Sequence, residues 1–172
     1  ADSLEGVKAA VLEKFRSTEP HAWGLSEFTV AKAPLDQLDL PEIVEIEPIH
    51  SCNMRCIMCH VSYEKLTQER IDVDRVLDQL QDFKGRWVTL SSSYESTLHP
   101  QFAELAQGLT DIGMKIDITT NGSLFTEKLV DRIKDCDFGV VTVSFDGIRK
   151  ESFEAIRGRA DFDRTMERIL RF

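Results

Sequence analysis

The sequence predicts an α/β fold in which parallel strands alternate with helices. A β-rich run followed by a segment of helical periodicity occurs four times in succession from residue 43 onward. Consecutive units of this kind form parallel strands with right-handed crossovers. Three of the strands alternate polar and apolar residues, whereas strands covered by helices on both faces are nearly continuous apolar runs. We therefore expect helices on one face and a polar, ligand-holding interior on the other, as in a curved sheet or barrel.

Polar residues recur at alternate positions along the predicted strands. The strands are expected at residues 43–50, 87–93, 114–122 and 138–147. The alternating polar residues are Glu45, Glu47, Asp117, Thr119, Asn121, Thr142, Ser144 and Asp146. An antiparallel sheet with one wet face shows the same alternation, but the helical segments between the strands argue against it. The polar residues become denser toward the C-terminal strand ends, where parallel α/β sheets bind ligands.

Helices are predicted where apolar residues recur on one face next to a capping signal. They are expected at residues 73–83, from about Pro100 to Ile112, after Thr126, around Phe153, and from Phe162 to Leu170. Asp72 and Thr126 are the expected N-caps. Residues 1–42 contain one amphipathic segment and are predicted to form an N-terminal helical extension outside the sheet. The α/β domain is therefore expected to cover residues 43–172.

The composition argues against some classes of binding partner. The net charge of −9 argues against a nucleic-acid backbone or an anionic membrane as the main partner. No apolar run approaches the ~18 residues of a membrane span, and the first residues lack the features of a secretory signal. We expect a cytoplasmic protein, in which thiols stay reduced and clustered cysteines indicate metal binding or catalysis.

Three of the four cysteines lie within eight positions, directly after the first predicted strand: Cys52, Cys56 and Cys59. Thiolates are soft ligands that select zinc or iron–sulfur clusters, and a loop can wrap three of them around one centre. Each iron of a [4Fe–4S] cluster takes one external ligand, so three cysteines leave one iron open. An open position is also what separates catalytic from structural zinc sites. We therefore favour an iron–sulfur cluster with one reactive iron.

A zinc-stabilised binding module is an alternative. A structural zinc ion is four-coordinate and is usually held by two pairs of ligands. His50 and His60 are the nearby candidates, but the sequence contains no second pair. Cys136, at the end of a predicted helix, is expected to be an ordinary, partly buried thiol. An electron-carrying iron–sulfur protein is a further alternative, which the missing fourth cysteine disfavours because such carriers usually complete each cluster with four.

The cysteine stretch CNMRCIMC resembles the signature of the radical S-adenosylmethionine (radical SAM) superfamily. TLHPQF, ITTNGS, VSFDG and FEAIRGRADFD follow it in the order usual for that superfamily. The set is most like the branch with C-terminal SPASM or twitch extensions. The resemblance implies a partial parallel (β/α) barrel in which about four of the usual six β/α units are present, so we expect a chain truncated after the fourth unit.

The resemblance also implies the chemistry. A [4Fe–4S] cluster sits on the three cysteines, and the amino and carboxylate groups of S-adenosylmethionine chelate its open iron. One electron then cleaves the sulfonium to methionine and a 5′-deoxyadenosyl radical, which takes a hydrogen atom from a polar substrate such as a peptide, protein side chain, sugar or nucleoside. The expected electron donor is of the flavodoxin or ferredoxin type.

Individual residues take roles from the same resemblance. Met58 is expected to touch the adenine, Arg157 to pair with the cosubstrate carboxylate, and Ser144 and Asn121 to contact the cosubstrate. The family commonly has Gly-Gly-Glu-Pro where this sequence has Ser93, Tyr94, Glu95 and Ser96. Glu95 is expected to hold the ammonium group, with the hydroxyl of Ser93 assisting. Glu45, Glu47, Asp117 and Thr142 are expected to face the substrate cavity.

Overall fold

The computed structural model describes residues 40–91 and 93–172. The expected N-terminal extension, residues 1–42, lies outside the described residues except for its last positions. Among the described residues, no helix is long and apolar enough to cross a membrane.

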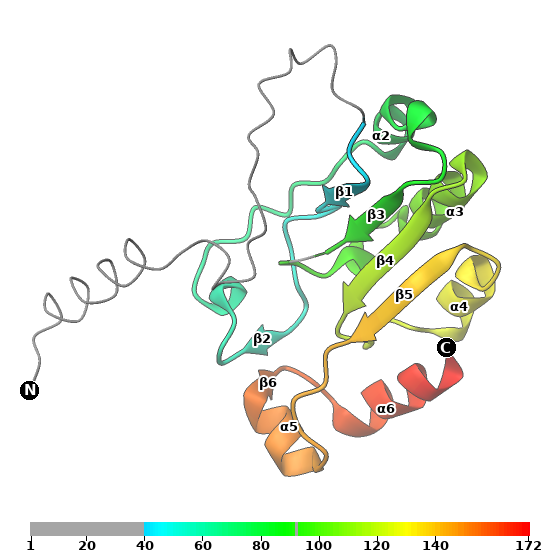
Figure 1. The fold of residues 1–172 in the computed structure, drawn as a ribbon. Coiled ribbons are helices and arrows are strands. Elements are labelled where there is room, and N and C mark those ends of the chain that lie inside the picture. Colours follow the sequence, from blue (N-terminus) through cyan, green and yellow to red (C-terminus); the bar gives the residue numbers. More distant parts are fainter. Residues whose placement is uncertain (1–39, 92) are drawn as a thin grey trace, which may run out of the picture. The chain divides into compact units, whose positions relative to one another are not determined.

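A four-stranded parallel sheet forms the centre of the described part of the chain (Figure 1). Its order is β1 (Ile43–Ile46), β3 (Trp87–Leu90), β4 (Lys115–Thr120) and β5 (Phe138–Val143). Neighbouring strands are parallel throughout, and helices connect them. The predicted α/β fold, a partial barrel of parallel strands, is confirmed.

Each strand ends earlier than the alternation predicted. Strand β1 stops at Ile46 and β3 at Leu90, and the polar residues that follow lie in loops. Side chains there accept hydrogen bonds from loop backbone. The carboxylate of Glu47, for example, accepts a hydrogen bond from the backbone N–H of Ser93 at 2.6 Å. The predicted strand ranges were therefore too long at their C-terminal ends.

Three helices pack against one face of the sheet, behind it in the view of Figure 1. They are α2 (Val73–Gln79), α3 (Phe102–Ile112) and α4 (Glu127–Ile133). Beneath them the side chains of Val88, Leu90, Ile116 and Ile118 are almost completely buried. Apolar residues of α3 recur at helical spacing and complete the core: Phe102, Leu105, Ala106 and Leu109.

Capping side chains set where the helices begin. Asp72 accepts a hydrogen bond from the backbone N–H of Arg75 at 3.1 Å, and Thr126 accepts one from Leu129 at 3.3 Å, so both predicted N-caps are confirmed. Helix α3 ends at Gly113, whose φ of 88° is left-handed and costs glycine little. The helix predicted at 73–83 is shorter than expected, because its last part forms a separate 3₁₀ turn, η4 (Gln81–Phe83).

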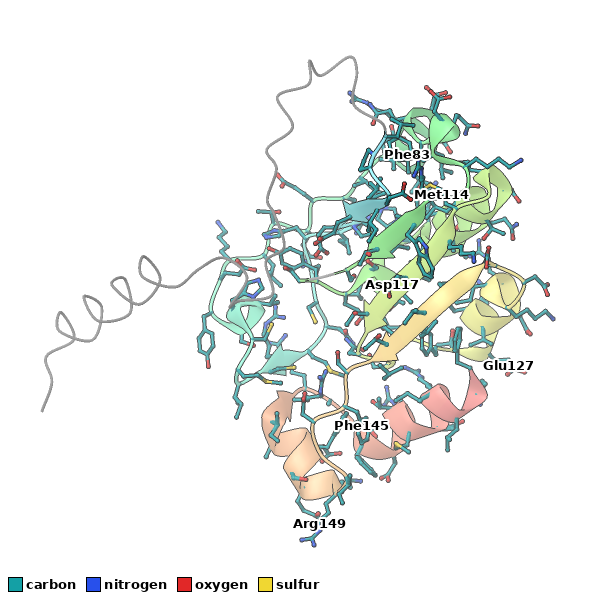
Figure 2. All side chains as sticks on the ribbon, viewed as in Figure 1. Phe83, Met114, Asp117, Glu127, Phe145 and Arg149 are labelled. Carbon is teal, nitrogen blue, oxygen red and sulfur yellow. The ribbon has the colours of Figure 1, made fainter. Side chains whose placement is uncertain are left out.

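Within the part of the chain that the structure describes, the opposite face of the sheet carries no helix and is here called the open face (Figure 1). Its side chains alternate with the buried ones, and Figure 2 shows Asp117 of β4 on this face. Near the strand starts the face is partly apolar, with Ile43 and Val140 exposed. Toward the strand ends it carries Thr119 and Thr142. One face thus builds the core, and the other is polar where the strands end.

A second, two-stranded sheet joins distant parts of the chain. Strand β2 (Arg55–Cys56), inside the cysteine loop, pairs antiparallel with β6 (Arg157–Gly158), which follows helix α5 (Lys150–Ile156). A Cβ on Gly158 would lie 2.4 Å from the carbonyl oxygen of Arg55, so a glycine is needed for this approach. Helix α6 (Phe162–Arg171) follows, and Phe172 stacks on Phe125 at 4.5 Å.

Candidate active site

A cavity of about 190 Å³ lies where the parallel strands end beside the cysteine loop. Its wall combines the cysteine loop, the loop after β3, the ends of β4 and β5, and β6. It is lined by Cys52, Met54, Cys56, Met58, Cys59, Ser91, Ser93, Tyr94, Glu95, Thr119, Thr120, Asn121, Ser144 and Arg157. The structure therefore brings together in one place all three cysteines and all six expected cosubstrate residues.

The backbone of the cysteine loop is fixed by its own arginine. One guanidinium nitrogen of Arg55, Nη1, donates to the carbonyl oxygens of Cys52 and Met54 at 2.8 and 2.7 Å. The loop is also anchored to α5, because the N–H of Ile57 donates to the carbonyl of Ile156 at 2.9 Å. These bonds place the three thiols along one wall of the cavity.

Two of these cysteine thiols have raised pKa values. Burial raises the pKa of Cys52, and the nearby carboxylate of Glu95 adds to that effect. Burial likewise raises the pKa of Cys56, although the charge of Arg157 acts in the opposite direction. A bound metal would take the place of the thiol protons, because cysteine binds metals as the thiolate.

The donor set fits an iron–sulfur cluster. Three soft thiols line one cavity together with both polar and apolar residues, and three thiolates leave one iron of a cluster open. Within residues 40–91 and 93–172, no three His, Cys, Asp or Glu side chains are arranged to hold a single metal ion. Cys136 lies elsewhere, packed partly against the core, with its Sγ 3.8 Å from Oε1 of Gln107.

Arg157 lies beside Cys56 because β2 and β6 pair these two residues. Its guanidinium forms an ion pair with Asp146 at 2.5 Å, and the side chain is only 7% exposed. Among the described residues, the buried Nε of Arg157 has no hydrogen-bond partner. Ser144 lies nearby, with its N–H bonded to the carbonyl of Thr120 at 2.9 Å. The sequence indicated Arg157 and Ser144 as site residues, but it gave no sign that Asp146 orients the arginine.

Glu95 is buried and heavily hydrogen-bonded. Its Oε1 accepts from the hydroxyls of Thr97 and Thr120 at 2.5 and 2.7 Å, and its Oε2 accepts from the N–H of Asn121 at 2.7 Å. Burial raises the pKa of Glu95, and these hydrogen bonds offset that rise only in part. The carboxylate therefore joins the loop after β3 to the end of β4, in addition to lining the cavity.

The loop that replaces the expected glycines is held by side chains. Ser91 has a left-handed backbone with φ of 67°, and its hydroxyl bonds both the side chain and the N–H of Ser96. The Tyr94 ring packs edge-on against His50, with the ring centroids 4.5 Å apart. Desolvation and a hydrogen bond to Glu64 raise the pKa of Tyr94. Tyr94 thus forms part of the cavity wall and braces it against the loop after β1.

The four residues expected to face the substrate lie outside the lining of this cavity. None of Glu45, Glu47, Asp117 and Thr142 is among the described residues that line it. Asp117 and Thr142 lie on the open face of the sheet, and Glu47 bonds the N–H of Ser93, which does line the cavity. Met58 is 58% exposed and lies at the rim.

Comparison with known proteins decides the family. The sequence profile of the Radical SAM superfamily matches residues 46–172, most of the chain. The protein belongs to the radical SAM superfamily. It is accordingly an enzyme, and the cofactors of its family are a [4Fe–4S] cluster and S-adenosylmethionine. Membership of this enzyme superfamily argues against the two non-catalytic alternatives.

Curated relatives are between a quarter and a third identical to this radical SAM chain over the aligned residues. Mycofactocin maturase MftC of Mycobacterium tuberculosis is 29% identical over 129 residues, which is 73% of this chain and 33% of the relative. A probable GTP 3′,8-cyclase of Saccharolobus islandicus is 31% identical over 142 residues, which is 78% of this chain and 45% of the relative. The chain thus spans less than half the length of these relatives.

Solved structures agree on the fold. Streptococcus suis SuiB bound to S-adenosylmethionine aligns with a TM-score of 0.62 at 19% identity, covering 74% of this chain and 30% of SuiB. SuiB bound to its precursor peptide SuiA gives a TM-score of 0.63 at 16% identity, over 95% of this chain and 41% of SuiB. BtrN in complex with AdoMet and 2-DOIA gives 0.55 at 20% identity, over 74% of this chain and 55% of BtrN.

Proposed function

We propose that this chain is the catalytic core of a radical SAM enzyme that abstracts hydrogen from a polar peptide substrate. The observation that carries the proposal is the single cavity that holds Cys52, Cys56 and Cys59 together with the residues expected to hold the cosubstrate. When bound, the cluster and S-adenosylmethionine supply a one-electron cleavage and a carbon radical that abstracts hydrogen. The chain's own residues bind, orient and shield these groups.

Each side of the cavity has its own role in this proposal. The three cysteines bind the cluster. Arg157, oriented by Asp146, pairs with the cosubstrate carboxylate, and its unpartnered Nε supports this role. Ser144 contacts the cosubstrate from the end of β5, and Met58 covers the adenine at the rim. Glu95, Ser93 and Asn121 receive the amino group on the opposite wall.

A peptide is the proposed substrate because SuiB, which has the same fold, has been solved with a precursor peptide. The similarity to mycofactocin maturase supports a place in the SPASM or twitch branch. The similarity to a probable GTP 3′,8-cyclase favours a nucleotide as the second candidate. In the proposal the enzyme is cytoplasmic and takes its electron from a flavodoxin or ferredoxin.

Anaerobic reconstitution with iron and sulfide tests the core of the proposal. We expect a brown protein with about four irons at the three-cysteine site. S-adenosylmethionine should change the EPR spectrum of the reduced cluster, and dithionite should then release 5′-deoxyadenosine. A colourless protein with one tightly bound zinc, or a cluster that does not respond to S-adenosylmethionine, would contradict the proposal.

The substrate class is tested separately, by measuring which candidate substrates accelerate the cleavage of S-adenosylmethionine. Synthetic peptides rich in polar residues and a set of nucleoside triphosphates are each added to the reduced enzyme with S-adenosylmethionine. Faster release of 5′-deoxyadenosine with peptides supports the first candidate, and faster release with GTP supports the second.

A further inference from the structure

The chain contains only two asparagines, Asn53 and Asn121, and their side chains bond to each other. Nδ2 of Asn121 donates to Oδ1 of Asn53 at 2.9 Å. Nδ2 of Asn53 donates to the hydroxyl of Ser123 at 2.8 Å, and that hydroxyl donates to Oδ1 of Asn121 at 2.6 Å. Among these three bonds each side chain donates once and accepts once, so the three side chains form a closed ring of hydrogen bonds, here called the Asn–Ser ring.

The Asn–Ser ring connects the two sides of the cavity. Asn53 directly follows Cys52 in the cysteine loop. Asn121 follows the end of β4, lines the cavity, and donates its backbone N–H to Oε2 of Glu95 at 2.7 Å. The ring therefore links the loop that carries the cluster to the wall that we propose receives S-adenosylmethionine, across 68 residues of sequence.

The ring is partly buried, and its direction is fixed because the backbone N–H of Ser123 also donates to Oδ1 of Asn121, at 2.9 Å. Asn121 and Ser123 are 5% and 9% exposed. Connected hydrogen bonds polarise and strengthen one another in such an environment. Turning either amide around would place two donors or two acceptors face to face, which is costly when buried. The ring therefore fixes both orientation and distance between the two segments.

We infer that Asn53 is a positioning residue, which acts through the Asn–Ser ring to set the distance between the cluster and S-adenosylmethionine. The inference rests on the proposed function. Reductive cleavage depends on close approach of cluster and sulfonium, and misplacement by about 1 Å can cost on the order of a hundredfold in rate. Arg55 fixes the loop internally, whereas the ring fixes the loop relative to β4.

The test compares Asn53→Ala, Asn121→Ala and the double variant in the full chain, loaded with its cluster under anaerobic conditions. Two quantities are measured: the dissociation constant of S-adenosylmethionine, from the EPR change of the reduced cluster, and the rate of 5′-deoxyadenosine release. The matched control is Ser62→Ala. The Ser62 hydroxyl donates to the carbonyl of Cys56 at 2.7 Å, so this variant loses a bond within the same loop and leaves the ring intact.

We expect Asn53→Ala to retain its iron, because the cysteines are unchanged, and to bind S-adenosylmethionine about tenfold more weakly. The double variant should bind no more weakly than Asn121→Ala alone, since either single change opens the same ring. Ser62→Ala should stay within about twofold of the wild type. Binding and cleavage by Asn53→Ala at wild-type levels, or independent penalties that multiply in the double variant, would overturn the inference.

A second variant covers the case in which Asn53→Ala does not load its cluster. Asn53→Asp keeps the acceptor for Asn121 and loses the donor to Ser123. We expect this variant to bind S-adenosylmethionine about threefold more weakly than the wild type. Wild-type affinity in that variant overturns the inference. Failure of the proposed function itself looks different, because the wild-type protein would then show no spectral response to S-adenosylmethionine.

Discussion

The two sides of the central sheet differ in role: one packs the core that stabilises the fold, and the other carries the candidate active site. On the helical face, Val88, Leu90 and Ile116 are completely buried beneath α3. On the other side, polar side chains surround a cavity at the strand ends, and three thiols and one arginine face into it. Changes on the first face should cost folding free energy, and changes around the cavity should cost cofactor binding.

Removal of any one of the three proposed cluster ligands should abolish activity without unfolding the protein. We expect Cys52→Ala, Cys56→Ala or Cys59→Ala each to reduce iron content to background, because too few thiolates remain to hold the cluster. Cys136→Ala is the matched control and should keep its iron, since this thiol lies outside the cavity. Iron and sulfide analysis after reconstitution gives the answer. An iron-free Cys136→Ala protein would contradict the assignment of ligands.

On the helical face, Leu105→Ala should have the largest effect on stability. Leu105 is completely buried in α3, so truncation leaves a cavity and costs about 2–5 kcal/mol. Leu170→Ala in α6 makes the same chemical change at a residue that is 79% exposed, and should cost less than about 0.5 kcal/mol. Urea unfolding followed by fluorescence measures both. Similar losses in the two variants would show that α3 is not the main packing helix.

Arg157→Gln tests a residue that we expect to contribute both to stability and to binding of S-adenosylmethionine. It breaks the ion pair with Asp146, and because Asp146 is about a third exposed we expect a stability loss of only about 1–3 kcal/mol. Affinity for S-adenosylmethionine should also fall, and this fall should persist under conditions in which the variant is fully folded. Arg149→Gln, in the loop before α5, is the control for loss of an exposed arginine. A variant with unchanged affinity would remove Arg157 from the proposed carboxylate site.

Much of this architecture follows from local sequence, and the rest depends on contacts between distant segments. Strands, helices and the caps Asp72 and Thr126 were predictable because periodicity and capping act over a few residues. The cysteine loop was recognisable for the same reason. By contrast, the pairing of Cys56 with Arg157 and the Asn–Ser ring join segments far apart in sequence. Asparagine and arginine are common in loops, so nothing local marks them as partners.

The smallest effect concerns His99, a buried residue at the turn before α3. Its Nδ1 accepts from the N–H of Gln101 at 3.1 Å, and its Nε2 lies 3.3 Å from the carbonyl oxygen of Ile71. The ring therefore carries its proton on Nε2 and is neutral. Burial lowers the pKa of His99, and the charge of Arg70 lowers it further. A second proton, on Nδ1, would face an N–H donor.

The sign of the pH effect follows from that lowered pKa. The unfolded chain takes up a proton at His99 below about pH 6.5, where the folded chain does not, so stability falls as pH decreases from that value. His99→Gln keeps an acceptor and a donor but does not titrate. Between pH 7.5 and 5.5, we expect the wild type to lose about 1 kcal/mol more unfolding free energy than the variant. Equal losses in urea titrations at the two pH values would show that His99 is protonated in the folded protein as readily as in the unfolded chain.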